Sequence, residues 1–284
     1  MTVRRTLPQR QRSLIGAWCF VDHYGPDDVG RSGGMVVPPH PHTGLSTVSW
    51  LFSGEIEHRD SAGHHVMVRP GEMNLMTAGR GISHSEYSTP QTTTLHGAQL
   101  WLALPDHARE TEPSFEHHRP EPIELAGVEV RVFLGQLLGS RSPVRTHSPL
   151  VGAEIKMAPG ATLEIPVDPA HEFGVLLDAG HLLVEGERVR KDDLGYVAPG
   201  RDRLVLSSPA GAMLLLIGGE PLGEQIVMWW NFIGRTHDEV VAYREQWQRA
   251  IAGEPNDRFR LPEDDPWEAL PAPVLPNGRL KPRG

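Results

Sequence analysis

Two pairs of side chains in this sequence could bind a metal ion. His40 and His42 form one pair, His84 and Glu86 form the other, and one residue separates the members of each pair. Residues i and i+2 of a β-strand point to the same face, so each pair could direct both side chains at one point. Imidazoles with one carboxylate suit a divalent ion such as iron, nickel, cobalt, copper, manganese or zinc. Four protein ligands on an ion that prefers six would leave positions open for water, substrate or dioxygen, which is typical of a catalytic site.

The residues between the two pairs predict short strands joined by turns. The stretch 47–52 is apolar, β-branched and aromatic, and Ser53-Gly54 follows it as a turn. A short strand at 74–76 and a glycine-rich turn at 77–81 then lead to His84. Strands and turns at this spacing suit a small antiparallel barrel, with the two ligand pairs on neighbouring strands that face its interior.

The spacing of these residues resembles that of the cupin superfamily. The first cupin motif runs from a glycine through five residues to His-x-His, as Gly34, His40 and His42 do here, and Gly54 closes it. Thr47 stands where that motif has a glutamate. In the second motif His84 lies two residues later than the general pattern, and this departure is typical of one branch, the pirins. Four stretches look like pirin signatures: 21–26, 39–44, 54–61 and 77–86.

The pirin resemblance extends to about Gly223 and implies a ligand set. Pirins bind iron through three histidines and one glutamate, which map onto His40, His42, His84 and Glu86. Glu86 would then compensate for the glutamate missing at position 47. The resemblance makes iron(II) the first expectation for a single bound ion. His58 would lie beside the barrel interior and orient a ligand or bound water, or it would form a surface pair with a carboxylate.

The same resemblance implies two classes of function. Several pirins open the flavonol ring of quercetin with dioxygen, so we expect a quercetin 2,3-dioxygenase-type oxidoreductase that acts on a small phenolic or enolic substrate. Glu86 would be the catalytic base that accepts a hydroxyl proton. Pirins are also described as iron-dependent regulatory proteins that act through protein partners, and this is the alternative. A metal-dependent isomerase or a sugar-binding cupin fits the fold but not the pirin-type motif, and ranks last.

An internal repeat predicts the architecture. The order of strand, turn and hairpin in 46–81 recurs in 173–200, but no ligand pair recurs with it. If Gly79 is aligned with Gly200, His84 falls opposite Val205 and Glu86 opposite Ser207. We therefore expect a mainly β protein of two stacked cupin, or jelly-roll, β-barrels. Residues 1–122 would form the metal-binding domain and residues 123–223 a degenerate cupin domain.

The last part of the chain, 224–284, should pack on the barrels. Thr236 and Glu239 form a capping box, and Val240, Tyr243, Trp247 and Ile251 form the apolar stripe of a helix that ends at Gly253. The aromatic Trp229-Trp230 before it is more typical of packing than of partner contact. The proline-rich stretch 254–284 predicts an extended tail in which Trp267 and Leu270 are the apolar anchors.

Composition and charge narrow the remaining classes. A formal net charge of −9 argues against a protein that binds nucleic acid through its phosphates. No run of about 18 apolar residues is present, which argues against a membrane span. The basic start lacks the apolar stretch of a secretory signal, and the single Cys19 cannot form an internal disulfide. These features favour a cytoplasmic protein without nucleic-acid or membrane partners.

Overall fold

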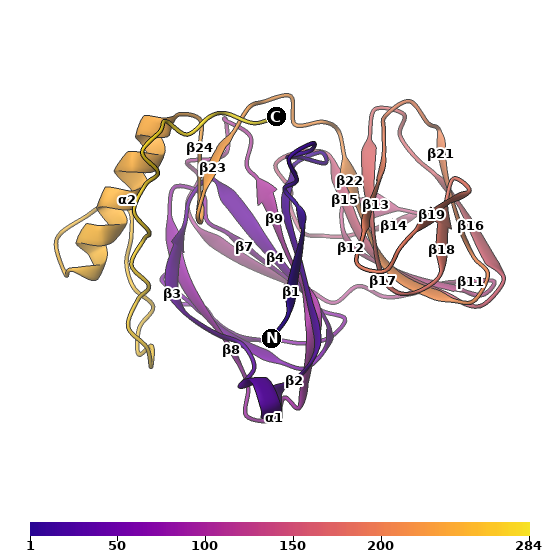
Figure 1. Ribbon diagram of the computed structural model, residues 1–284, viewed down its shortest axis with the longest axis horizontal. Helices are drawn as coiled ribbons and strands as arrows, with labels where there is room; N and C mark the ends of the chain where they lie inside the picture. The colour runs from indigo at the N-terminus through magenta and orange to yellow at the C-terminus, as the bar shows by residue number, and fades with distance from the viewer.

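The computed structural model describes residues 1–284 and shows a mainly β chain (Figure 1). Strands of the first half form two antiparallel sheets that face each other across the first barrel. The six-stranded sheet runs in the order β1 (Val3–Leu7), β2 (Trp18–Asp28), β9 (Thr94–Ala103), β4 (Leu45–Ser53), β7 (Met73–Thr77), β10 (Ser114–His118). The four-stranded sheet runs in the order β3 (Val36–His42), β8 (Ile82–Ser88), β5 (Ile56–Asp60), β6 (His65–Val68).

The second half of the chain repeats this arrangement. Its six-stranded sheet runs in the order β11 (Ile123–Leu125), β12 (Val128–Leu134), β15 (Leu150–Met157), β22 (Ala212–Gly219), β17 (Glu172–Gly180), β20 (Leu194–Val197). Its four-stranded sheet runs in the order β16 (Ala161–Pro166), β21 (Arg203–Ser208), β18 (Leu182–Val184), β19 (Glu187–Val189). The prediction of two stacked cupin domains is confirmed.

Three small elements complete the strands and helices of the two domains. The helix α1 (Val29–Ser32) follows β2, and a hairpin of β13 (Gln136–Leu137) and β14 (Ser140–Arg141) lies in the second half. A further hairpin, β23 (Val227–Trp229) and β24 (Phe232–Gly234), follows the second domain.

No helix in the chain is both long enough and apolar enough to cross a membrane.

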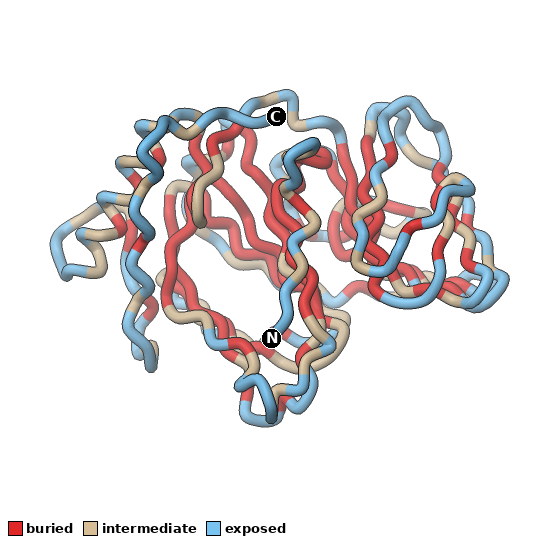
Figure 2. Tube along the Cα trace, in the orientation of Figure 1, coloured by how far each residue is buried: buried red, intermediate tan, exposed pale blue.

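The two domains are joined through their six-stranded sheets, which share one apolar layer. Trp50 of β4 stacks on Phe133 of β12 with ring centroids 4.7 Å apart. The indole nitrogen of Trp50 donates a hydrogen bond to Glu154 of β15, at 2.8 Å. The indole nitrogen of Trp18 donates to the carbonyl oxygen of Gly218, at 3.1 Å. Strands in this layer are covered on both sides, which explains why they are buried along most of their length (Figure 2).

Alternation along β4 separates the two faces of the first six-stranded sheet. Val48 and Trp50 belong to the apolar layer between the domains. Thr47 and Ser49 alternate with them and are also buried, so they point the other way, into the first barrel. The interior of the first barrel is therefore partly polar at positions where a simple core would be apolar.

The C-terminal helix is α2 (His237–Ile251), and it confirms the prediction from the capping box. The Thr236 side chain accepts from the backbone nitrogen of Glu239, and the Glu239 carboxylate accepts from the Thr236 backbone nitrogen. Val240, Tyr243 and Trp247 are buried on one face. That face packs on the hairpin β23–β24, beside the first barrel (Figure 1).

The tail after α2 runs as an extended chain, but the predicted anchors are wrong. Trp267 and Leu270 are 56% and 36% exposed, whereas Phe259 and Ala272 are 2% and 5% exposed. Phe259 is the true anchor because its ring packs against that of Trp247, with centroids 5.6 Å apart. A large aromatic side chain can remain on the surface of a folded protein, so side-chain size alone did not identify the contact.

Candidate metal centre

The strands β3 and β8 bring the predicted ligand pairs together. They pair antiparallel with His40 opposite His84, while Glu86 lies opposite His58 of β5. The register of β3 shifts between Val37 and His40, at prolines that cannot donate to the ladder. Such a bulge redirects the side chains that follow it. The prediction that the pairs lie on neighbouring strands and face inward is confirmed, because β3 pairs with β8 and all four side chains line one cavity of the first barrel.

The three histidine rings converge. The ring centroids are 5.0 Å apart for His40 and His42, 4.4 Å for His40 and His84, and 4.9 Å for His42 and His84. One ligand nitrogen from each ring lies within 4.8 Å of the others. The Nε2 atoms of His42 and His84 are 3.0 Å apart. This separation is close to that of two nitrogens bound to one divalent ion.

Burial keeps these rings in the form that binds metal. It lowers the pKa of His40 to about 4, against a hydrogen bond with the Pro38 carbonyl that raises it. Burial, with the neighbouring imidazoles as a second cause, lowers the pKa of His42 and His84 well below the ordinary value. All three are therefore neutral at pH 7, with ring lone pairs available to an ion.

Glu86 lies at the edge of the histidine cluster. Its carboxylate is within 4.8 Å of nitrogens of His84 and His58, but it does not lie within that distance of both His40 and His42. Burial raises the pKa of Glu86, and the charge of His58 opposes this. A carboxylate in this place can approach an ion at the cluster or hold a proton beside it.

His58 is buried against His84, which decides between the two interpretations of the sequence. It is 3% exposed, and its Nδ1 lies 3.3 Å from Nδ1 of His84. Its Nε2 lies 3.3 Å from the buried carboxylate of Asp60. The ring contacts the side of His84 that faces away from His42. His58 is therefore placed to fix the orientation of a ligand histidine, an arrangement common around metal sites.

The cluster forms one wall of a cavity of about 210 Å³ inside the first barrel. Phe20 and Trp101 contribute apolar surface, and their rings stack at 4.0 Å. Tyr24 also lines the cavity, and its hydroxyl is buried without a hydrogen-bond partner. Burial raises the pKa of Tyr24 well above its ordinary value, with the charge of Glu86 as a further cause, so the hydroxyl keeps its proton.

Sequence reasoning did not single out Tyr24. The residue lies inside the pirin-like stretch 21–26, but only the placement of β2 shows that it faces the cavity. Gly97 leaves room for its ring, because a Cβ there would lie 2.9 Å from the hydroxyl oxygen. The sequence held one signal for this placement: neighbouring residues of a strand point to opposite faces, so Tyr24 and His23 of β2 must face different sides of the sheet.

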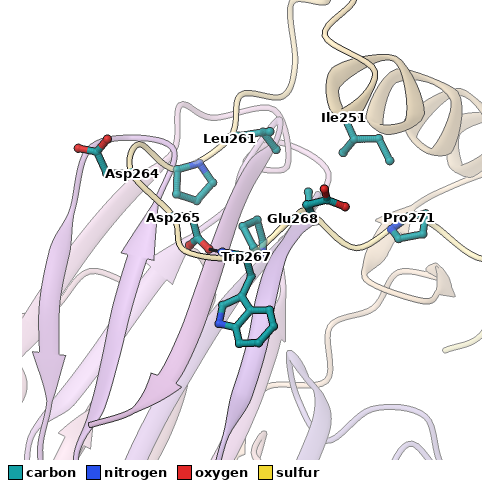
Figure 3. A pocket seen from close by; sticks show the side chains of 10 residues that line it. Ile251, Leu261, Asp264, Asp265, Trp267, Glu268 and Pro271 are labelled. Carbon is teal, nitrogen blue, oxygen red and sulfur yellow. Dashed lines mark hydrogen bonds between the residues drawn. The ribbon is translucent and has the colours of Figure 1, made fainter. Parts of the chain in front are cut away.

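The tail braces the outer face of the strand that carries His84. Between its inward residues, β8 presents Ser83, Ser85 and Tyr87 outward. Ser83 donates to the carbonyl oxygen of Arg260, and Ser85 and Tyr87 both donate to the carboxylate of Asp265. Figure 3 shows Asp265 on the stretch of tail that passes these strands, beside a cavity of about 700 Å³.

Three further histidines, His64, His65 and His117, belong to no metal-type group of this cluster. His64 and His65 pair with Asp60 and Glu57 at the β5–β6 hairpin. His117 contacts Asn74 on β7, through its Nδ1 and the side-chain oxygen. His65 and His117 are therefore parts of polar pairs at the surface, whereas His64 shares the buried carboxylate of Asp60 with His58.

Comparisons with known proteins place the chain in a family. Residues 1–102 match the Pirin family model, and residues 152–253 match that of the Pirin C-terminal cupin domain. A Pseudomonas aeruginosa protein, named provisionally as a quercetin 2,3-dioxygenase, is 45% identical over 253 residues, or 89% of this chain and 80% of that protein. A pirin-like protein of Caulobacter vibrioides is 35% identical over 281 residues, or 95% of this chain and 94% of that protein.

A solved structure agrees over nearly the whole chain. The crystal structure of a quercetin 2,3-dioxygenase from Acinetobacter baumannii superposes with a TM-score of 0.92 at 40% identity, covering 99% of this chain and 92% of that one. Two stacked cupin domains, with converging histidines in the first, define a bicupin with a metal-site geometry in one barrel. The matches over both halves make it a member of the pirin family.

Proposed function

We propose that this protein is a metal-dependent dioxygenase that acts on a small phenolic or enolic substrate of the quercetin type. The observation that carries the proposal is the convergence of three buried, neutral imidazoles on one wall of a cavity in the first barrel. The names of the Pseudomonas and Acinetobacter relatives support the reaction class. One divalent ion, with iron(II) as the first choice, would be held by His40, His42, His84 and Glu86.

The residues present fit such an ion. The Nε2 atoms of His42 and His84 face each other at 3.0 Å, and burial keeps both rings neutral with lone pairs available to an ion. Imidazole and carboxylate ligands with open positions are the donor set of non-haem iron sites. When bound, the ion would supply Lewis-acid activation of the substrate oxygen and the capacity to react with dioxygen.

Two side chains of the cavity can handle the substrate proton and oxygen atoms. Glu86 has a raised pKa, which brings its proton affinity closer to that of a phenol or enol, so it can accept the hydroxyl proton. Tyr24 keeps its proton and has no partner, so it can donate a hydrogen bond to a substrate oxygen. The apolar walls around Phe20 and Trp101 exclude water from the reacting atoms.

The size of the cavity limits the substrate. At about 210 Å³ it is smaller than the roughly 300–1,000 Å³ typical of pockets for larger organic ligands. A single aromatic or enolic ring fits this space better than a multi-ring flavonol. Met1 and Val3 line the cavity from the N-terminal strand. Displacement of this strand would be needed to admit quercetin, so single-ring catechols should be tested beside it.

Dioxygen uptake tests the proposal directly. Protein purified without metal would be loaded anaerobically with iron(II), nickel(II) or copper(II), and uptake measured with quercetin and with a single-ring catechol. We expect uptake at about one metal per first-barrel site, lost in His84→Ala and kept in His118→Ala, which changes a histidine outside the cluster. Bound metal with no uptake from any such substrate would contradict the proposal. It would instead favour the regulatory alternative, to be pursued by isolating a protein partner.

A further inference from the structure

A second cluster of ligand-type side chains lies between the two domains, outside the proposed active site. It consists of His23 on β2, His96 on β9 and Asp178 on β17. The Nε2 atoms of His23 and His96 lie 2.7 Å and 2.6 Å from the same carboxylate oxygen of Asp178. His23 and Asp178 are 0% and 2% exposed. The first domain supplies both imidazoles, and the second supplies the carboxylate.

The packing of the two six-stranded sheets brings these residues together. Leu176 belongs to the apolar layer between the domains, and Asp178 follows two residues later, at a register shift of β17 between Leu177 and Ala179. Ala98 belongs to the same layer on β9, with His96 two residues before it. The cluster is therefore a polar point within the sheet-to-sheet interface. It forms only when both domains are folded and in contact.

Protonation of His23 poses a problem that hydrogen bonds alone do not solve. Its Nδ1 lies 3.1 Å from a carboxylate oxygen of Asp192, yet both atoms are buried without a hydrogen-bond partner. A neutral ring that donates from Nε2 to Asp178 must turn the lone pair of Nδ1 toward Asp192. Two buried acceptors would then face each other, which is costly. The conflict disappears if the ring carries a proton on both nitrogens, or if Nε2 carries no proton and its lone pair binds a cation while Nδ1–H donates to Asp192.

A divalent ion on Nε2 resolves this conflict. His23 would bind through Nε2 and donate its Nδ1 proton to Asp192, the arrangement in which a carboxylate orients a metal-bound histidine. The charges also suit a cation, because the carboxylates of Asp178 and Asp192 both face His23 and Arg4 pairs with Asp192 at 3.1 Å. Arg131 and Lys156 in the neighbouring cavity are paired with carboxylates of their own, on Glu129 and Glu154. Ligand atoms around a zinc ion lie about 3.3 Å apart, so small side-chain rotations would be enough to admit it.

We propose that His23, His96 and Asp178 form a second divalent-cation site, of the zinc type, that joins the two domains. Two imidazoles and one carboxylate leave the fourth tetrahedral position to water. An entry path exists, because His96 also lines a cavity of about 370 Å³ between the domains, together with Phe52, Arg119 and Lys156. The site is separate from the first-barrel cluster and does not depend on the proposed dioxygenase activity.

Zinc stoichiometry on the full-length chain tests this site. The variant His42→Ala/His84→Ala removes two ligands of the first-barrel cluster, so any remaining tight site must lie elsewhere. Equilibrium dialysis against zinc should give two ions per wild-type chain and one per chain of this double variant. Adding Asp178→Asn, which keeps the shape of the side chain, should abolish the last ion. Adding His118→Ala instead should leave it bound.

Cobalt(II) provides a readout that is independent of folding stability and of activity. In the double variant, cobalt should give the visible absorption of a tetrahedral site, and this absorption should disappear with Asp178→Asn or His96→Gln. Circular dichroism would establish that each variant remains folded. Absence of a bound ion in the double variant would overturn the proposal, as would zinc binding that Asp178→Asn and His96→Gln leave unchanged. The cluster would then be a hydrogen-bonded contact that holds a proton.

Discussion

The two barrels have the same strand order, but the interior of the first carries polar side chains and the interior of the second is apolar. In the first, β3 pairs with β8 and places His40 opposite His84, both turned inward. In the second, β16 pairs with β21 and places Ile165 opposite Leu204 at the corresponding inward positions. The interior of the second barrel is a single cluster of 22 buried apolar residues. The fold therefore tolerates either filling, and the side chains of two strand pairs decide which barrel can perform chemistry.

The difference shows how stability and function are divided between the domains. An apolar interior contributes about 25 cal/mol for each Å² of apolar surface that it buries. Buried imidazoles contribute less, because they lose hydration and need partners. The first barrel keeps a cavity and polar side chains at its centre, while the second barrel and the apolar layer between the sheets supply continuous packing. This comparison predicts that equivalent substitutions will have different consequences in the two barrels.

The largest contrast is expected between His84→Ala and Leu204→Ala. His84→Ala should reduce metal-dependent activity by at least about 100-fold, because loss of a ligand should cost more activity than the 10- to 100-fold loss typical of residues that only orient ligands. The stability of the fold should change little. Leu204→Ala should lower the free energy of unfolding by about 2–5 kcal/mol and leave metal content unchanged, because it opens a cavity in an apolar core. Denaturant unfolding and metal analysis of both variants would check this. Equal losses of stability in the two would contradict the comparison.

Acid should lower the stability of the first barrel through the buried His40, whereas the core of the second barrel has no titratable group. Burial lowers the pKa of His40 from 6.5 to about 4, so below pH 6.5 the unfolded chain takes up this proton more readily than the folded one. Stability of the metal-free protein should fall as the pH drops from 6.5 to 4, by about 3 kcal/mol for this group. Denaturant unfolding across that range would show a smaller fall in His40→Ala. An identical pH profile would refute the assignment.

The sequence predicted the ligand strands better than the details around them. Spacing of i and i+2 placed His40 and His42, then His84 and Glu86, on the correct faces because strand period is a local property. The alignment of the repeats failed by one residue. It put Val205 opposite His84, although Leu204 is the inward residue. A shift of one residue reverses the face of a strand, and loop lengths before β21 differ from those before β8.

Contacts between segments that are distant in the chain could not be predicted from the sequence. His23 and Asp178 are 155 residues apart and meet only through the packing of two sheets. The tail was predicted to be extended, yet its anchor is Phe259 because α2 and the hairpin β23–β24 create the groove that receives it. Pattern analysis identifies periodic elements, but it contains no signal for which surfaces those elements will cover.

His58 offers a finer test of the polar barrel. His58→Gln should weaken metal binding by about 10–100-fold, because it removes the imidazole that contacts the outer side of His84. The effect should appear in the dissociation constant measured by competition with a chelator, with native circular dichroism. His65→Ala, which changes an exposed histidine on the neighbouring strand β6, serves as the matched control. Equal metal affinity in wild type and His58→Gln would show that His84 is oriented without this contact.

The smallest effect should come from the tail, which braces β8 but has no counterpart on β21 in the second barrel. Asp265→Asn replaces a carboxylate that accepts from both Ser85 and Tyr87, and charge-assisted bonds are stronger than neutral ones. We expect the metal affinity of the first barrel to fall by about 3- to 10-fold, roughly 1 kcal/mol for a weakened hydrogen-bonded contact. Limited proteolysis should cut the tail of this variant sooner. Asp264→Asn is the control, because its carboxylate makes no bond to β8, and equal behaviour of the two variants would mean that β8 holds its ligands unaided.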